Sequence, residues 1–284
     1  MGTARRPDLA LAATKRMVNE TLFRRLTPPV IQDLMIRWGK RVLGTRLILI
    51  ACFPKSGSTF ISRTMHELPG FAKLSAVPIH DRREQELERE SIRSLIGLRK
   101  NAVYQHHVRH SLHLEHLIAD YNIHIVVMVR DLRDVCQSVS DHLNSESPVW
   151  FNAFLDEDTL ADLNRDNRLP EFIVDLMIPW YVNFYAGWTA YDRSGGSVQW
   201  INYEDMVGNE LATISSILTG AGLEVSESEI QRALDQPRFT RLNVGKVGRG
   251  REFLREHPEA AETLKRYLSY YPDVDFRPIY DPTR

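Results

Sequence analysis

The clearest pattern along the chain is a series of short apolar runs, each followed by a segment with helical spacing. Residues 46–52 and 123–129 are apolar at nearly every position, which is typical of strands buried on both faces of a parallel sheet. Residues 101–105 form a shorter run, and residues 197–203 form another that follows a Ser-Gly-Gly turn at 194–196. The pattern therefore predicts strands in all four places.

Helical patterns fill the intervals between these strands. The predicted helices cover residues 61–68, 110–120, 132–143 and 171–191, the last with Pro179 inside it. Mixed charges at residues 81–90 predict a solvated helix, and residues 144–170 predict an irregular segment with one short helix. Because strands alternate with helices, we expect an α/β fold with a central parallel sheet flanked by helices, and ligands at the carboxyl ends of the strands.

The beginning of the chain differs from the rest. We predict a tail and helical extension over residues 1–45 and a single α/β domain over residues 46–284. The extension is basic and is interrupted at Pro28-Pro29, where a helix cannot continue. The apolar run at residues 9–13 is too short for a signal sequence or a membrane span.

Composition narrows the classes of function. With 284 residues and 43% of them hydrophobic, the chain can bury one large core. The net charge of −1 gives no overall attraction to nucleic acid or to an anionic membrane, so an anion site must be local. Cys52 and Cys136 fall inside predicted elements and suit core positions rather than a disulfide framework, which predicts a reducing, cytoplasmic compartment.

The strongest candidate site follows the first predicted strand. There, residues 54–59 read Pro-Lys-Ser-Gly-Ser-Thr and run into a helical pattern. Unpaired N–H groups at a helix start, together with the charge of Lys55, favour an anion such as phosphate. The usual nucleoside-triphosphate loop places its Lys after the second of two glycines, whereas Lys55 precedes Gly57. The alternative is a turn whose Lys, Ser and Thr only cap the helix.

A second phosphate signal follows the strand at 123–129. Arg130 ends this strand and Ser138 lies eight residues later, one to two turns into the next helix, so both side chains can meet on one phosphate. The other interpretation is an ion pair of Arg130 with Asp131 or Asp134. Two such signals, each directly after an apolar strand, favour a ligand that carries two phosphates.

These motifs resemble those of sulfotransferases that use 3′-phosphoadenosine 5′-phosphosulfate (PAPS), over about residues 46–251. The resemblance implies a P-loop-like nucleotide-binding architecture, PAPS as the sulfuryl donor and no metal. It assigns the 5′-phosphosulfate to Lys55, Ser56, Gly57, Ser58 and Thr59. It assigns the 3′-phosphate to Arg130 and Ser138.

Two further positions are similar to residues that lie against the adenine in this family. Phe60 occupies the place of a stacking Trp, and Tyr203 opens a Tyr-Glu-Asp-Met segment like that of the family. Tyr203 is equally well read as a strand end whose acidic neighbours cap the next helix.

Residues 243–251 resemble a Gly-rich segment that closes over the 3′-phosphate in this family. Gly245 and Gly248 keep the Gly-x-x-Gly spacing of the family, although Asn and Val stand at 243 and 244 in place of Arg and Lys. The resemblance assigns Gly245, Lys246 and Arg249 to the donor, with Arg251 as another cation that can complete the site.

The resemblance also implies a histidine base at the end of a strand before Arg130. His107 best matches that register and His106 is the alternative, pointing to the other side if the strand persists. Gln105 falls where a Lys often assists, so stabilisation of the leaving phosphate is assigned to Lys55. The histidines between 106 and 116 do not match zinc-ligand spacing and are expected to be solvated or packed.

The acceptor is not defined by the sequence. Aromatic residues that either fill the core or line an acceptor pocket are Trp150, Phe151, Phe154, Trp180, Tyr181, Phe184, Tyr185 and Trp188. Their helical spacing favours the core. The resemblance implies a hydroxyl group of a small molecule, lipid or carbohydrate as acceptor, with no nucleic acid partner, and leaves the oligomeric state open.

Two other functions remain open at this point. An ATP-dependent small-molecule kinase would require a metal and would not need Arg130 or Ser138. A nucleotide-binding protein without catalytic activity is suggested by the altered Gly-rich segment.

Overall fold

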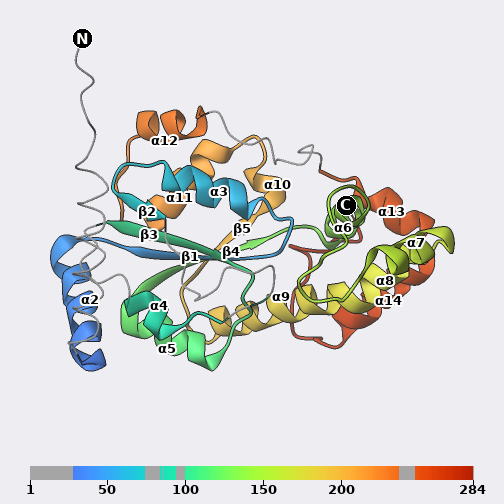
Figure 1. Ribbon diagram of the computed structural model, residues 1–284, viewed down its shortest axis with the longest axis horizontal. Coiled ribbons are helices and arrows are strands. Elements are labelled where there is room, and N and C mark those ends of the chain that lie inside the picture. The colour runs from blue at the N-terminus through green and yellow to red at the C-terminus, as the bar shows by residue number, and fades with distance from the viewer. Residues whose placement is uncertain (1–27, 74–83, 85, 94–99, 237–246, 284) are drawn as a thin grey trace, which may run out of the picture.

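The structure, a computed structural model, describes residues 28–73, 84, 86–93, 100–236 and 247–283 (Figure 1). In this part of the chain, five strands form one fully parallel sheet with the order β2-β3-β1-β4-β5. They are β1 (Leu47–Cys52), β2 (Phe71–Lys73), β3 (Asn101–His106), β4 (Ile123–Val129) and β5 (Val198–Asn202). The α/β fold with a central parallel sheet is confirmed, and β2 is a strand that the sequence pattern did not predict.

The central strand β1 is buried on both faces, which explains its continuous apolar run. All six of its residues are 0% exposed. It pairs in parallel with β3 on one side and with β4 on the other. Leu47 and Leu49 belong to one hydrophobic core, while Ile48 and Ile50 belong to a second core on the opposite face. The two cores hold the strand between two layers of helices.

Helices cover both faces of the sheet (Figure 1). One face carries α3 (Ser58–His66), α11 (Glu210–Gly220) and α12 (Glu227–Leu234), and the other carries α5 (Leu112–Tyr121) and α9 (Ile178–Arg193). Beyond the carboxyl ends of the strands lie α6 (Leu132–Ser145), α7 (Glu157–Arg165), α8 (Leu169–Phe172), α13 (Gly250–Glu256) and α14 (Pro258–Ser269). The remaining helices are α2 (Pro29–Leu43), α4 (Arg89–Arg93) and α10 (Tyr203–Met206). In the described ranges, no helix combines the length and the apolar character that crossing a membrane requires.

Three predicted elements differ from the observed ones. The expected helix at 81–90 begins only at Arg89 as far as the described residues show, since 84 and 86–88 have no regular structure. The segment 144–170 holds α7 and the start of α8 where one short helix was expected. The long helix expected at 171–191 is interrupted by a π-helical turn, Ile173–Met177. Pro179 follows this turn and lacks the N–H that a regular α-helix would use there, which favours the wider turn.

Helix α6 is fastened to α13 through one carboxylate. The Asp134 oxygens accept hydrogen bonds from the N–H groups of Gly248 and Gly250, both at 2.7 Å. The backbones approach so closely that a Cβ atom on Gly250 would lie 1.9 Å from the carbonyl carbon of Arg133. Position 250 therefore requires glycine because of this contact.

Gly250→Ala should lower the free energy of unfolding by about 1–3 kcal/mol, because the added methyl group must push α13 away from α6. Urea unfolding measures the change. Gly187→Ala in α9 is the matched control, since its Cβ atom would meet only the Cβ atom of His110 at 3.5 Å and a helical Ala is favoured. Equal stability of the two variants would contradict the packing described.

Candidate functional site

The loop between β1 and α3 turns sharply at two positions. Lys55 has a φ of 66° and Gly57 a φ of 76°, so both lie in the left-handed region. The Ser56 hydroxyl donates to the carbonyl oxygen of Phe53 at 2.7 Å and braces the turn. Gly57 is the N-cap of α3 and has no side chain with which to cap the helix start. The first N–H groups of the helix therefore lie at this loop, as an anion site requires.

Gly57 also allows the loop to lie directly on the residues that follow β5. A Cβ atom at this position would lie 2.7 Å from Cε of Met206 and 3.1 Å from the ring of Tyr203. Tyr203 is buried, with 3% of its surface exposed. The ring of Tyr203 therefore packs against the loop at Gly57.

Arg130 connects the end of β4 to the same loop. Its Nη1 atom donates to the carbonyl oxygen of Lys55 at 2.9 Å. Its guanidinium carbon lies 4.1 Å from the ring centre of Tyr203, a cation–π contact. Arg130 is 8% exposed, and its Nε atom is buried without a hydrogen-bond partner in the described part of the chain. A buried guanidinium N–H without a partner is costly and points to an anionic ligand beside it.

Of the two ion pairs considered for Arg130, with Asp131 and with Asp134, only the second is present, and it is long. Asp131 pairs with Arg133, whose Nη2 lies 2.5 Å from Oδ2. Asp134 lies 3.7 Å from Nη2 of Arg130, beyond hydrogen-bond distance. Its oxygens instead accept from the backbone of the segment before α13. Ser138 lies one turn further along α6 and is 7% exposed.

Lys55 lies close to a carboxylate that the sequence did not single out. Its Nζ atom is 3.8 Å from Oε1 of Glu146, and the Lys55 side chain is 17% exposed. Oε2 of Glu146 accepts from Nδ1 of His142 at 3.0 Å. The end of α6 thus contributes an acid and a histidine to the charged surroundings of the loop.

His107 follows β3 directly and is fixed against β1. Its Nδ1 atom lies 3.0 Å from the carbonyl oxygen of Cys52 and 3.4 Å from the sulfur of the same residue. A carbonyl oxygen only accepts hydrogen bonds, so Nδ1 carries a proton, and the lone pair of the ring in its neutral form lies on Nε2. This is the arrangement that a general base requires.

The Cys52 thiol is the second influence on His107. Burial opposes the charged imidazolium, but the sulfur and the carbonyl oxygen outweigh it and raise the pKa of His107 above its ordinary value. Cys52 is itself buried, yet His107 lowers the pKa of its thiol. The next residue back along β3 is His106, whose carbonyl oxygen accepts from the Cys52 sulfur at 3.5 Å. Before it, Gln105 donates through Nε2 to the Ser58 hydroxyl at 3.1 Å.

The other histidines of the 106–116 cluster diverge, as expected of packed or solvated residues. His110 bonds to Glu115 at 2.7 Å, whereas His113 bonds to the carbonyl oxygen of Leu87 at 3.1 Å. Where side chains are described, no three His, Cys, Asp or Glu residues are grouped to hold a metal ion.

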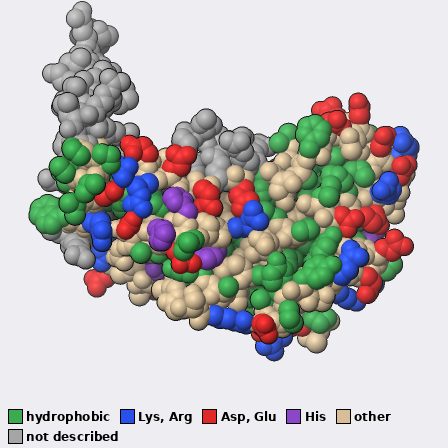
Figure 2. All heavy atoms as spheres, turned by 90° about the horizontal axis from the view of Figure 1, so that it is seen from below, with side chains coloured by type: hydrophobic (Ala, Val, Ile, Leu, Met, Phe, Trp, Pro, Cys, Tyr) green, Lys and Arg blue, Asp and Glu red, His purple; other side chains and the backbone are tan. Residues whose placement is uncertain are grey.

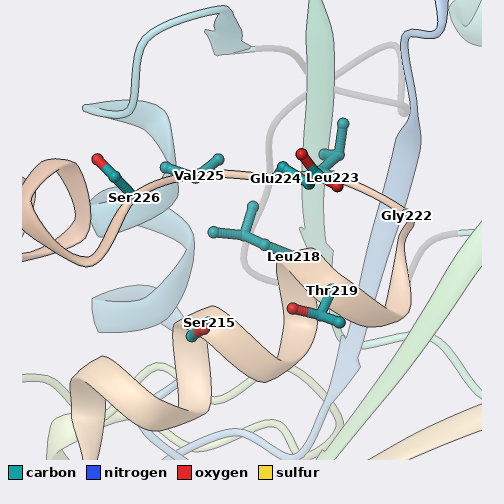
Figure 3. A pocket seen from close by; sticks show the side chains of 8 residues that line it. All are labelled: Ser215, Leu218, Thr219, Gly222, Leu223, Glu224, Val225 and Ser226. Atoms are coloured by element: carbon teal, nitrogen blue, oxygen red, sulfur yellow. The ribbon is translucent and has the colours of Figure 1, made fainter.

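Two hollows lie near the sheet. Phe60 lines one of about 570 Å³, between the start of α11 and the end of α12. Figure 3 shows the other, of about 530 Å³, formed by the end of α11 and residues 222–226. The second hollow adjoins the start of β1, since Nε of Arg46 donates to the carbonyl oxygen of Ala221 at 2.9 Å. This hollow therefore lies at the amino ends of the strands, whereas the loop lies at their carboxyl ends.

The Gly-rich segment is described only in part. Gly245 and Lys246 lie outside the described residues. Arg249 pairs through Nη1 with Oδ2 of Asp141 on α6 at 2.8 Å, and Arg251 is exposed. The described end of this segment therefore lies against the helix that carries Ser138.

The aromatic residues divide into two groups. Those of α9 are buried in the core, as the helical spacing favoured, and they are Trp180, Tyr181, Phe184, Tyr185 and Trp188. Residues 147–155 form no regular helix or strand, and Phe154 in this segment is 89% exposed. The ring of Phe151 is centred 5.8 Å from that of His107. This segment therefore adjoins the candidate base.

One comparison with known proteins identifies the family of this chain. A model of the sulfotransferase domain matches residues 45–255. The structure of mouse sulfotransferase SULT7A1 complexed with PAP is similar with a TM-score of 0.53 and 15% identity, over 78% of this chain and 82% of that chain. At this identity the likeness shows the fold alone. A search of curated protein sequences gave no match.

Two further solved structures are similar at lower TM-scores. Sulfotransferase STF1 from Mycobacterium tuberculosis has a TM-score of 0.43 and 16% identity, over 78% of this chain and 76% of that chain. Retinol dehydratase in a complex with retinol and PAP has a TM-score of 0.44 and 17% identity, over 78% and 80%.

Cys52→Ala should lower the pKa of His107, because burial then acts against the imidazolium without the opposing sulfur. NMR titration of the imidazole measures this change. Cys136→Ala, which removes the second buried thiol, is the control and should leave the titration of His107 unaltered. An unchanged His107 pKa in Cys52→Ala would show that the sulfur does not influence the ring.

Proposed function

The chain belongs to the sulfotransferase domain family and acts by PAPS-dependent sulfuryl transfer, and we propose that His107 activates the acceptor hydroxyl while Lys55 stabilises the departing phosphate. The observation that carries the proposal is the contact of His107 Nδ1 with the Cys52 carbonyl oxygen at 3.0 Å. It fixes the ring at the carboxyl end of β3, next to the strand whose loop contains Lys55. The base and the loop therefore open on the same edge of the sheet.

The residues present fit a donor with two phosphate groups. The uncapped start of α3 and the charge of Lys55 suit the 5′-phosphosulfate, with Ser56, Gly57, Ser58 and Thr59 around it. The buried Nε of Arg130 and the hydroxyl of Ser138 suit the 3′-phosphate. PAPS, when bound, supplies the activated sulfuryl group and leaves as 3′,5′-adenosine diphosphate.

The adenine end is proposed on weaker contacts. Phe60 offers aromatic surface to a hollow that is large enough for a base, whereas Tyr203 is buried beside Gly57 and stays assigned to the adenine by resemblance. Gly245, Lys246 and Arg249 stay assigned to the 3′-phosphate side by resemblance, with Arg251 as the alternative cation. The ion pair of Arg249 with Asp141 of α6, the helix of Ser138, supports that assignment.

The protein's own groups perform two tasks in the reaction. Nε2 of His107 accepts the proton of the acceptor hydroxyl, since Nδ1 already carries a hydrogen. The ammonium of Lys55 and the N–H groups of the loop hold the negative charge on the 5′-phosphate. The second task is electrostatic and needs fixed positions, which the bracing of the loop by Ser56 provides.

We further propose that the acceptor is an alcohol or phenol with an apolar or ring-shaped body. Phe151, beside His107, and the exposed Phe154 belong to the same irregular segment and offer apolar surface to such a molecule. Cys52 and Cys136 are both free thiols, which suits the proposed cytoplasmic, reducing compartment.

His107→Ala should lower the rate of sulfate transfer by about a hundredfold to ten-thousandfold, the usual contribution of a general base. Transfer of labelled sulfate from PAPS to a panel of alcohols and phenols measures the rate. Calorimetry should show that 3′,5′-adenosine diphosphate still binds, because its phosphates are assigned to the loop after β1 and to Arg130 and Ser138. His106→Ala is the matched control and should keep most of the activity; the reverse outcome would move the base to His106.

Ser138→Ala should weaken binding of 3′,5′-adenosine diphosphate about tenfold to hundredfold, since a hydrogen bond to a charged group is worth about 1.5–3 kcal/mol. Binding of 5′-AMP, which has no 3′-phosphate, should not change. Ser140→Ala on the same helix is the control for effects on α6 itself. If wild-type protein binds ATP more tightly than the 3′-phosphorylated nucleotide, the donor assignment is wrong.

A further inference from the structure

Helix α2 presents an exposed apolar stripe at one end of the molecule. Its members follow the helical repeat, and each is between 43% and 69% exposed: Val30, Ile31, Leu34, Met35 and Trp38. Figure 2 shows hydrophobic side chains gathered at the end of the molecule where Figure 1 places α2. A contiguous stripe of this kind, with a Trp in it, is unusual for a surface that meets only water.

The opposite face of α2 is fixed to the body of the protein. Ile36 is buried, and Asp33 accepts from both Nε and Nη2 of Arg93 at 2.9 Å. Asp33 is also bonded to the hydroxyl of Tyr121. Because Asp33 is the only acidic residue of α2, the helix turns its negative charge inward and leaves none beside the stripe.

The charge of this part of the chain is opposite to that of the remainder. Residues 1–43 contain nine Lys and Arg against three Asp and Glu, a net charge of +6, whereas the whole chain has −1. Arg37 of α2 is exposed next to Trp38. Apolar residues with an aromatic on one face, and cations around them, are the features of a helix that lies in a lipid headgroup layer.

We propose that α2 docks the protein on an anionic lipid surface, with the stripe among the headgroups and Arg37 facing the lipid charges. Charge complementarity favours this occupant over a second copy of the chain, because two segments of +6 would repel each other. The helix leads into the amino end of β1, so the site at the carboxyl ends of the strands stays away from the lipid. This docking is independent of the assignment of the reaction.

Co-sedimentation of the full chain with vesicles tests the proposal. Binding to vesicles of phosphatidylcholine mixed with phosphatidylglycerol is expected, with little binding to phosphatidylcholine alone and a decrease as salt increases. Leu34→Asp should weaken the binding at least tenfold. Leu112→Asp, at a position on α5 that is 66% exposed, is the matched control and should bind as the wild type does.

A second variant separates a loss of lipid binding from misfolding of Leu34→Asp. Arg37→Gln keeps the apolar stripe, so it should melt at the wild-type temperature and bind anionic vesicles several-fold less tightly. Failure of the wild type to bind anionic vesicles, or equal binding by Leu34→Asp that melts normally, would overturn the proposal. A dimer in light scattering that Leu34→Asp dissociates, without vesicle binding, would assign the stripe to a second copy instead.

Discussion

Parallel pairing of β1 between β3 and β4 is the constraint on which the site depends. Parallel strands end at the same edge, so the loop after β1, His107 after β3 and Arg130 after β4 emerge together. The hydrogen bond from Arg130 to the Lys55 carbonyl oxygen and the one between His107 and the Cys52 carbonyl oxygen then lock these ends to one another. The pairing of the strands sets the spacing between these three segments, and their side chains determine the chemistry.

The carboxylates near Arg130 already have other hydrogen-bond partners. Asp134 accepts hydrogen bonds from two backbone N–H groups, and Asp131 pairs with Arg133. Some N–H groups of Arg130 are therefore available to bind a ligand. Tyr203 supports the guanidinium from one side without neutralising it. A phosphate that enters here meets a cation already held in place, which lowers the ordering cost of binding.

Four of the five strands in the described part of the chain, and the two loops proposed to bind phosphate, were predictable because they are local in sequence. A continuous apolar run followed by Lys55 and its neighbours, or by Arg130, signals a strand and its functional end within a few residues. The contacts that refine the site join distant parts of the chain. Cys52 and His107 are 55 residues apart, and Asp134 and Gly248 are 114 apart. No local spacing encodes such pairs, and for the same reason Glu146 beside Lys55 was not expected.

The irregular segment at 147–155 has a consequence for how this protein can change over time. The residues proposed to bind the donor, and the proposed base, follow strand ends buried in the sheet, where most substitutions disturb the fold. The surface beside His107 comes instead from a segment without ladder or helix bonds to preserve, with Phe154 almost fully exposed. If this segment binds the acceptor as proposed, substitutions in it change which molecules are recognised and leave the donor residues intact, so new specificities can arise without a loss of foldability.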